Sequence, residues 1–341
     1  PWRVQAVLMS IFQDTLVSQK NLGMELVRVT EAAALACGRQ MGRGDSEEIR
    51  RSAAEAMSQA LGSVNMDAEI RVVVGGARDG ESLAPGLRCG QGLGPRVDLA
   101  AGPLDGVSLV ARGLTGAMAV IAATDRDAMR LPPRGILLEK IAVGAGARGA
   151  VDINESVENN LNRIAFAKRM RVSDLTLVIL DRPRNQLLLE EARRAGARVS
   201  MISDGEVAAA VRVALENSGV DVVMGIGGTE DATIAACALK CLGGELVARP
   251  WVRNAEEAAE MRAAGVEPTM VFTTDDLAGG EEVVFAATGV TDGLLLHGVS
   301  YHDRWAESDS LVIRSQSGTL RRISTKHHLA TAHIEGSRQV R

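Results

Sequence analysis

The second half of the chain alternates between helical and strand patterns, and this alternation restricts its fold more than any other feature. From about residue 157 onward, apolar residues at helical spacing repeatedly give way to short β-branched runs. Such alternation predicts βαβ units that form a sheet with helices on both faces. The expected helices are 157–170, 185–195, 206–216 and 229–241, and the expected strands are 175–180, 198–202 and 220–224.

The first half of the chain separates helices from strands. It predicts one helix over 22–39 and another that opens after Asp45, a residue type that caps helix N-termini. Glycine-rich turns then separate short β-prone runs, a pattern typical of a meandering mixed sheet. The expected strands there are 70–74, 97–101, 107–111 and 117–123, and the later ones are 283–287, 310–315 and 320–324.

These patterns divide the chain into four parts. An amphipathic extension over 1–20 is expected to pack on the body of the protein or on a partner. A mixed-sheet domain is predicted over 21–155 and a βαβ-type domain over 156–323, followed by a tail without periodicity over 324–341. The fold class is therefore layered α/β in two domains, as expected for a chain of 341 residues.

Composition excludes several classes of function. A net charge of -5 gives no electrostatic basis for binding a nucleic-acid backbone, and an aromatic content of 2% leaves few groups for base stacking. No apolar run approaches the ~20 residues of a membrane-spanning helix.

The four cysteines lack the spacing of a zinc site or of a disulfide framework. We therefore expect reduced thiols in the cytoplasm or in an organelle interior such as the plastid stroma or the mitochondrial matrix. A secreted protein is not expected.

Two strand-to-helix connections could bind an anion. The glycine-rich turn 225–228 places backbone N–H groups at the start of a helix, where the helix dipole favours negative charge; a purely steric role for the glycines is the alternative. The segment 181–184 carries Arg182 and Arg184, whose guanidinium groups could hold a phosphate through paired hydrogen bonds. The alternative for this segment is a solvated helix start.

The segments 102–107, Gly-Pro-Leu-Asp-Gly-Val, and 42–45, Gly-Arg-Gly-Asp, are the most informative stretches of the sequence. Through them the chain resembles the class II fructose-1,6-bisphosphatases, which are part of the lithium-sensitive sugar phosphatase superfamily. The resemblance runs in the same order from Glu25 to about Ile323. Further matching stretches are 28–36, 138–147, 182–184, 204–209, 225–228 and 285–290.

The resemblance implies a layered αβαβα fold in two domains and a homodimer or homotetramer. It also implies a phosphoric monoester hydrolase that removes the 1-phosphate of fructose 1,6-bisphosphate. Cyanobacterial-type members also hydrolyse sedoheptulose 1,7-bisphosphate. Carboxylates in such an enzyme hold Mg²⁺ or Mn²⁺ against the phosphate, and the reaction belongs to carbohydrate metabolism, in gluconeogenesis and the Calvin cycle.

Several positions depart from the family pattern on the metal side. The family has a metal-binding Asp where this chain has Gly102, and a water-orienting Thr where this chain has Val107. The family turn Gly-Glu-Gly-Glu is Gly-Gly-Ala-Arg at 75–78, which removes two acids and adds a cation that disfavours a metal ion. Asp79 or Glu81 could move into the vacant place.

Other family positions keep their chemistry. Asp45, Asp105 and Asp231 keep a carboxylate at three metal positions, so they could still bind one ion weakly; roles as helix caps and turn formers are the alternative. On the substrate side, the residues that match phosphate- and sugar-contacting positions are Arg182, Arg184, Asp204 and Glu206. By contrast, a family Tyr is replaced by Leu137, and the His-Asp pair that follows the arginine is replaced by Asn185 and Gln186.

These departures predict a class II fructose-bisphosphatase homologue whose hydrolysis is lost or severely impaired, with no resident metal. In this hypothesis the fold serves as a structural or sugar-phosphate-binding subunit, in a homo-oligomer, in a larger complex or beside an active paralogue. The alternative is an active Mg²⁺- or Mn²⁺-dependent bisphosphatase whose rearranged site recruits Asp79 or Glu81.

Overall fold

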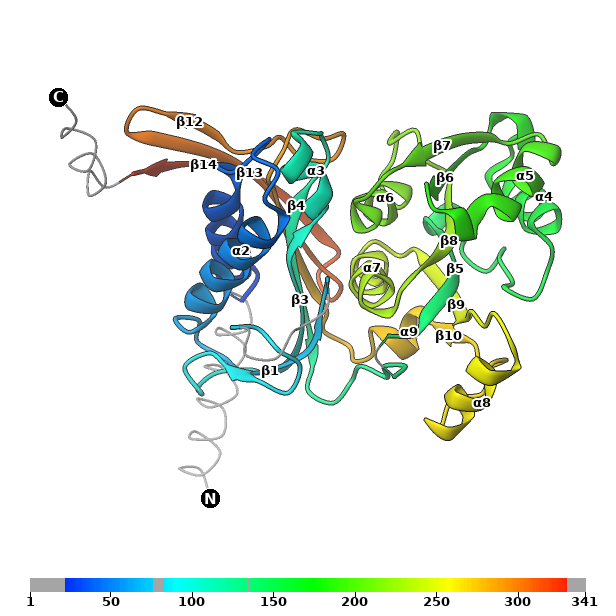
Figure 1. The fold of residues 1–341 in the computed structure, drawn as a ribbon, viewed down its shortest axis with the longest axis horizontal. Helices are drawn as coiled ribbons and strands as arrows, with labels where there is room; N and C mark the ends of the chain where they lie inside the picture. Colours follow the sequence, from blue (N-terminus) through cyan, green and yellow to red (C-terminus); the bar gives the residue numbers. More distant parts are fainter. Residues whose placement is uncertain (1–21, 76–81, 134, 330–341) are drawn as a thin grey trace, which may run out of the picture.

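The computed structural model describes residues 22–75, 82–133 and 135–329. The predicted amphipathic extension over 1–20 and most of the predicted tail lie outside these ranges. The described residues form five alternating layers of helices and sheets, which run from left to right across Figure 1. The αβαβα arrangement implied by the family resemblance is confirmed.

The first sheet has eight strands in the order β12-β13-β11-β4-β3-β1-β2, with β14 paired to the other side of β13. β1 and β3 are parallel and the remaining neighbours are antiparallel, so the sheet is mixed as predicted. Its strands are β1 (Asp67–Val73), β2 (Arg88–Cys89), β3 (Arg96–Asp105), β4 (Met118–Asp125), β11 (Val284–Gly289), β12 (Ser300–His302), β13 (Trp305–Arg314) and β14 (Thr319–His328).

The second sheet has six strands in the order β10-β9-β5-β8-β6-β7. β6 lies parallel to both β7 and β8, which confirms the predicted βαβ units, whereas β5, β9 and β10 add antiparallel pairs. Its strands are β5 (Leu137–Val143), β6 (Thr176–Leu180), β7 (Arg198–Ile202), β8 (Val222–Gly228), β9 (Glu245–Pro250) and β10 (Phe272–Thr273).

Helices cover the outer faces of the two sheets and fill the space between them (Figure 1). A helix over 22–38 and α2 (Ser46–Leu61) pack on the outer face of the first sheet. α4 (Val157–Lys168) and α5 (Gln186–Arg194) pack on the outer face of the second sheet. The central layer holds α6 (Glu206–Val213) and α7 (Thr229–Cys241), which share one apolar core with both sheets. Smaller helices are α3 (Val107–Arg112), α8 (Ala255–Ala263) and α9 (Thr274–Leu277).

Two predicted elements are corrected by the structure. The segment 107–111 is not a strand, because α3 occupies it. Gly106 and Gly113 flank this helix with φ values of 93° and 69°, a left-handed conformation that glycine adopts at no steric cost and that turns the chain out of β3. The tail does not begin at 324, because β14 continues to His328 in a ten-residue pairing with β13.

The two sheets do not follow the predicted domain boundary at residue 155. β5 belongs to the second sheet although it precedes that boundary, and β11 to β14 return to the first sheet. The division into folding domains therefore stays a prediction, while the sheets divide the chain into an interrupted first part and a continuous second part.

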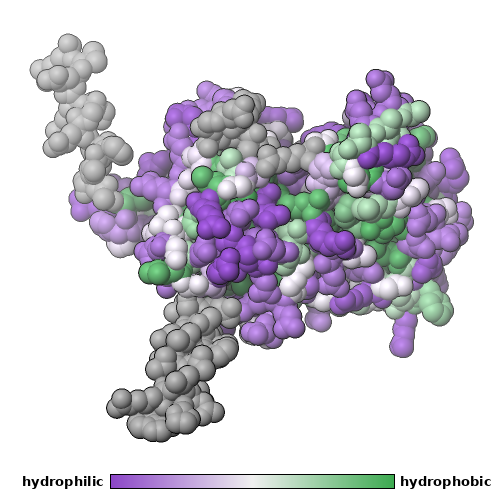
Figure 2. Space-filling model, turned by 90° about the horizontal axis from the view of Figure 1, so that it is seen from below, coloured by the Kyte–Doolittle hydropathy of each residue, from purple (hydrophilic) through white to green (hydrophobic). Residues whose placement is uncertain are grey.

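The surface and the cysteines agree with the exclusions drawn from composition. Hydrophilic side chains cover much of the face in Figure 2, with apolar patches between them. Among the residues described here, no helix has both the length and the apolar character needed to cross a membrane. All four cysteines are free thiols, and the compartment stays a prediction.

Candidate functional site

A cluster of acids lies where the end of β3, the start of α6 and the first turn of α7 meet. Asp105 ends β3, Glu206 begins α6 and Asp231 lies in the first turn of α7. Asp204 belongs to the connection between β7 and α6. The charges of Asp204, Glu206 and Asp231 all raise the pKa of Asp105, so the structure brings together acids that are far apart in the sequence.

Within this cluster, the pKa values of Asp105 and Asp231 are raised. Burial raises the pKa of Asp105 well above its ordinary value, and the negative charge of Asp231 adds to this effect. Burial also raises the pKa of Asp231 to about 7, while the positive charge of Lys140 acts in the opposite direction. One carboxylate oxygen of Asp105, Oδ2, has no hydrogen-bond partner in the described part of the chain.

A buried lysine supplies the positive charge of the cluster. Lys140 Nζ lies 3.0 Å from Glu206 Oε2, and only 4% and 9% of the two side chains are exposed. An ion pair removed from water in this way requires its partner, because an isolated buried charge is strongly destabilising. Sequence reasoning missed this pair, because its two residues are 66 positions apart and lie in different elements.

The turn 225–228 gives room to the charged and polar groups around it. A Cβ atom on Gly227 would lie 2.5 Å from Glu206 Oε2 and 2.7 Å from Lys140 Nζ, and one on Gly228 would lie 3.0 Å from Asp231 Oδ2. A Cβ atom on Gly227 would therefore require the ends of the Glu206 and Lys140 side chains to shift, and one on Gly228 would be in tight contact with Asp231. The steric alternative for the glycines is therefore supported, and anion binding by this turn stays a prediction.

Asn185 fixes the position of the same turn. Its amide oxygen accepts a hydrogen bond from the Ile226 N–H at 2.8 Å, and its amide nitrogen donates to the Leu180 carbonyl at 2.8 Å. The side chain is buried, and both of these bonds satisfy groups that would otherwise be costly to bury. Asn185 is thus a structural residue that connects β6 to β8.

The two arginines of the 181–184 segment lie beside the acid cluster. The Arg184 Nε donates to the Ile226 carbonyl at 2.8 Å, and a terminal nitrogen of Arg182 donates to the Ser203 carbonyl at 2.8 Å. Burial and the neighbouring Arg182 charge lower the pKa of Arg184, whereas Glu206 and Asp231 act in the other direction. Within the described residues neither guanidinium forms an ion pair with a carboxylate.

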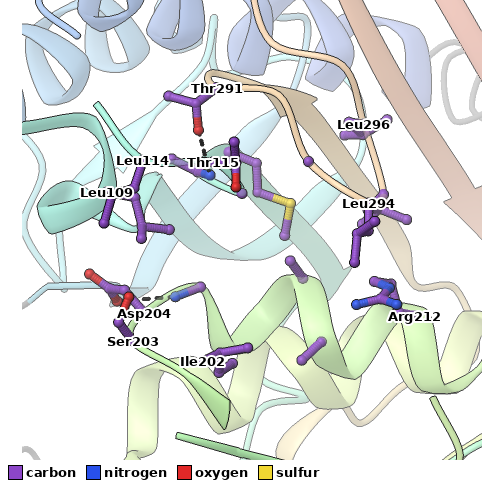
Figure 3. Close-up of a pocket in the computed structure, with 18 of the residues that line it drawn as sticks. Leu109, Leu114, Thr115, Ile202, Ser203, Asp204, Arg212, Thr291, Leu294 and Leu296 are labelled. Atoms are coloured by element: carbon purple, nitrogen blue, oxygen red, sulfur yellow. Dashed lines mark hydrogen bonds between the residues drawn. The ribbon is translucent and has the colours of Figure 1, made fainter. Parts of the chain in front are cut away.

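Asp204 joins the two sides of the site. The Ser108 hydroxyl in α3 donates to Asp204 Oδ2 at 2.6 Å. The Gly205 N–H donates to Asp204 Oδ1 at 3.1 Å, and Figure 3 labels Asp204 at this place. The first bond crosses between the helix that follows β3 and the loop that precedes α6. Sequence reasoning missed Ser108, because its partner is 96 residues away.

The position of Gly102 is filled by apolar neighbours. A Cβ atom there would lie 2.4 Å from Val120 Cγ2 and 3.4 Å from Ile234 Cδ1. An aspartate at this position therefore needs a shift of the facing strand or helix. Val107, at the start of α3, offers no hydroxyl to a water molecule.

The third predicted metal residue, Asp45, has another role in the structure. Its side chain caps α2 by accepting from the Glu48 N–H at 3.0 Å, as the alternative interpretation predicted. Over residues 22–75, 82–133 and 135–329, no three acids, histidines or cysteines form a group that could hold a metal ion. Asp79 and Glu81 lie outside these ranges, so their recruitment to the site stays a prediction.

Comparisons with known proteins identify relatives across nearly the whole chain. Residues 20–327 match the family of bacterial, glpX-encoded fructose-1,6-bisphosphatases. A fructose-1,6-bisphosphatase class 2 from Haemophilus influenzae is 36% identical over 323 residues, which cover 91% of this chain and 97% of the relative. Two D-fructose 1,6-bisphosphatase class 2/sedoheptulose 1,7-bisphosphatases from Synechococcus strains are 38% and 37% identical over 337 residues, 90% of this chain and 95% of each relative.

Proposed function

Because the chain belongs to the family of bacterial, glpX-encoded fructose-1,6-bisphosphatases, we propose that its candidate site binds a sugar bisphosphate of the fructose 1,6-bisphosphate type. The observation that carries this proposal is the pair of guanidinium groups on Arg182 and Arg184. Both lie at one strand-to-helix connection, and neither has an ion-pair partner in the described residues. Two adjacent cations without carboxylate partners are suited to a phosphate dianion.

The geometry of each arginine supports the same ligand. Arg184 uses its Nε to hold the Ile226 carbonyl, which leaves its terminal nitrogens to donate to phosphate oxygens. Asp204 and Glu206 lie beside the arginines and can accept hydrogen bonds from sugar hydroxyl groups. Asp231 and Asp105 complete the acidic side of the site, on which a divalent cation would have to bind.

Hydrolysis of the bound ester is the point on which two candidate functions differ. The names of the relatives favour an active Mg²⁺- or Mn²⁺-dependent phosphatase, which would act on fructose 1,6-bisphosphate and on sedoheptulose 1,7-bisphosphate. The unpartnered Oδ2 of Asp105 is an atom that such a cation could bind. A metal ion would there polarise the phosphate ester and lower the pKa of a water molecule.

Local geometry favours the other candidate, a sugar-bisphosphate-binding protein with severely impaired hydrolysis. Val120 and Ile234 fill the space beside Gly102, the described acids form no three-donor group, and Lys140 already neutralises part of the acid cluster. Phosphoryl transfer depends almost entirely on positioning and charge stabilisation, so the joint loss of ligands and of the threonine hydroxyl should be costly. We therefore expect binding with slow hydrolysis.

Calorimetry on the whole chain tests the binding proposal. Fructose 1,6-bisphosphate should bind at saturable stoichiometry, and Arg184→Gln should weaken binding by about tenfold or more. Arg193→Gln, which changes an exposed arginine at the end of α5, is the matched control and should leave the affinity unchanged. Absence of saturable binding to the unaltered chain would reject the proposal.

Phosphate release tests the two candidates against each other. With Mg²⁺ or Mn²⁺ present, the chain should hydrolyse either bisphosphate at least about a thousandfold more slowly than the Haemophilus influenzae relative. A rate comparable with that of the relative would identify the active phosphatase instead.

Assembly is a separate part of the proposal. We infer a homo-oligomer or a place in a larger complex, including one with an active paralogue. Light scattering on the eluting chromatographic peak should give a mass above that of one 35.9 kDa chain. A monomer mass would restrict the proposal to assembly with a different protein.

A further inference from the structure

A cavity lies beside the loop that carries Asp204. Its volume is about 330 Å³, and it opens between α3, the start of β4, α6 and the loop 291–296 (Figure 3). Asp204 lines it and also belongs to the acid cluster, so the two sites adjoin at the loop that precedes α6. Neither Arg182 nor Arg184 lines it, so it is distinct from the proposed phosphate site.

The walls of this cavity are mainly apolar. Leu109 and Leu114 come from α3 and the residues that follow it, Ile202 comes from β7, and Leu294 and Leu296 come from the loop. A sugar bisphosphate would leave its hydroxyl groups without partners against such walls, which is unfavourable. An aliphatic or aromatic body would instead remove both itself and these side chains from water.

A single guanidinium group supplies the positive charge of the cavity. Arg212 projects from α6 beside Leu294 in Figure 3 and donates one hydrogen bond, to the Ser218 carbonyl at 2.8 Å. Within the described residues it forms no ion pair, and burial lowers its pKa from the ordinary value. Its remaining N–H groups can therefore donate to an anion.

The opposite end of the cavity has the reverse charge. Asp204 lies there with both oxygens already accepting hydrogen bonds, one from Ser108 and one from Gly205. A second anionic group on a ligand would meet this carboxylate and be repelled. The charge distribution thus favours one negative group, placed at the Arg212 end.

We propose that this cavity is a binding site for a small amphipathic organic monoanion, with its apolar body between α3, α6 and the loop 291–296 and its anionic group on Arg212. The volume lies at the lower end of the range for small-molecule sites, about 300–1,000 Å³, so the body corresponds to one or two fused rings or a short alkyl chain. The two sites share Asp204, but this proposal does not rest on the proposed function, because its cation and its apolar walls are other residues.

Paired fluorescent probes test the proposal. 8-Anilinonaphthalene-1-sulfonate carries one sulfonate on an aromatic body, and N-phenyl-1-naphthylamine is its neutral counterpart. The sulfonate probe should bind the whole chain at one site and lose about tenfold in affinity in Arg212→Gln. Glutamine is shorter than arginine, so the substitution removes the charge together with the bond from the terminal nitrogen to the Ser218 carbonyl. The neutral probe should bind both proteins with the same affinity.

Two further variants control the experiment. Arg193→Gln should leave both probes unaffected, and Ala208→Phe, which fills the cavity from α6, should remove binding of both. Near-ultraviolet circular dichroism checks that each variant keeps its tertiary structure. Equal affinity of the sulfonate probe for the unaltered chain and Arg212→Gln would overturn the proposal, as would an absence of binding. If Ala208→Phe fails to fold, the affinities of the sulfonate probe for Arg212→Gln and Arg193→Gln still test the proposal.

Discussion

The two sides of the candidate site differ in what they keep of the family chemistry. On the side of the second sheet, Arg182 and Arg184 lie near Asp204 and Glu206 and form no ion pair with any residue that the structure describes. On the side of the first sheet, glycine and valine stand at 102 and 107, and apolar atoms occupy the space that a longer side chain would need. In the proposed function, ligand recognition and metal-assisted hydrolysis would depend on different parts of the candidate site, so one could be lost without the other.

Lys140 is the residue whose loss should have the largest effect, since it holds the acids of both sides together. Lys140→Met should lower the free energy of unfolding by about 3–5 kcal/mol, because Glu206 would stay buried without its cation. Chemical denaturation measures the change. Lys326→Met, which removes an exposed ion pair with Glu307, should cost less than about 1 kcal/mol.

A second variant separates charge from packing in this experiment. Adding Glu206→Gln to Lys140→Met removes both charges and should recover a large part of the lost stability. If the double variant is no more stable than Lys140→Met alone, the ion pair is not the cause of the loss.

The acidic side should also make stability depend on pH. The pKa of Asp231 is raised to about 7 in the folded chain, so the folded state binds more protons than the unfolded state over the range above the ordinary aspartate value. Stability from this group is therefore present at low pH and falls as the pH rises toward about 7. Asp231→Asn should remove this loss and gain up to about 2 kcal/mol relative to the unaltered chain between about pH 5 and pH 7.

Denaturation curves at several pH values check this sign. Glu256→Gln, an exposed change on α8, should keep the pH profile of the unaltered chain. A difference between Asp231→Asn and the unaltered chain that does not change with pH would contradict the prediction.

The contrast between the two sides also decides what the sequence could reveal. Continuous apolar segments such as α7 and β6 were predicted close to their observed bounds. The short segment 107–111 was misassigned, because five residues rich in valine carry no periodicity that distinguishes a strand from one helical turn. Local pattern therefore predicted the layers better than it predicted the connections, which carry the site.

Residue contacts of the site depended on strand pairing that no single segment encodes. Gly102 and Val120 are direct partners across β3 and β4, and Lys140 pairs with Gly225 across β5 and β8. Comparison with the family motif identifies Gly102 as the position of a missing ligand. Only the strand register shows that the Val120 side chain fills the space beside it. Motif residues were predictable because a motif is local in the sequence, whereas their neighbours in space come from distant segments.

A smaller effect on stability is expected at Gly102, which lies on the first-sheet side of the site. Gly102→Ala should lower the free energy of unfolding by about 1–3 kcal/mol, because the added Cβ would lie 2.4 Å from Val120 Cγ2. In a Val120→Ala background the same substitution should cost about 1 kcal/mol less, because the close atom has been removed. Additive effects of the two changes in denaturant titrations would mean that Val120 does not fill this space.

The smallest effect is expected for Ser108, which links the two sides through Asp204. Ser108→Ala should cost about 1 kcal/mol of stability, since the hydroxyl bond at 2.6 Å is replaced by a partly solvated carboxylate that can find water. The substitution should have a greater effect on ligand binding. Asp204 would be held only by the Gly205 N–H, so the affinity for fructose 1,6-bisphosphate should fall although Arg182 and Arg184 are unchanged. Calorimetry on Ser108→Ala and Ser108→Thr separates the two effects, because threonine keeps the hydroxyl and should restore the affinity. Unchanged affinity in the alanine variant would mean that the two sides recognise their ligand independently, and that the loss of chemistry on the first-sheet side imposed no constraint on the second.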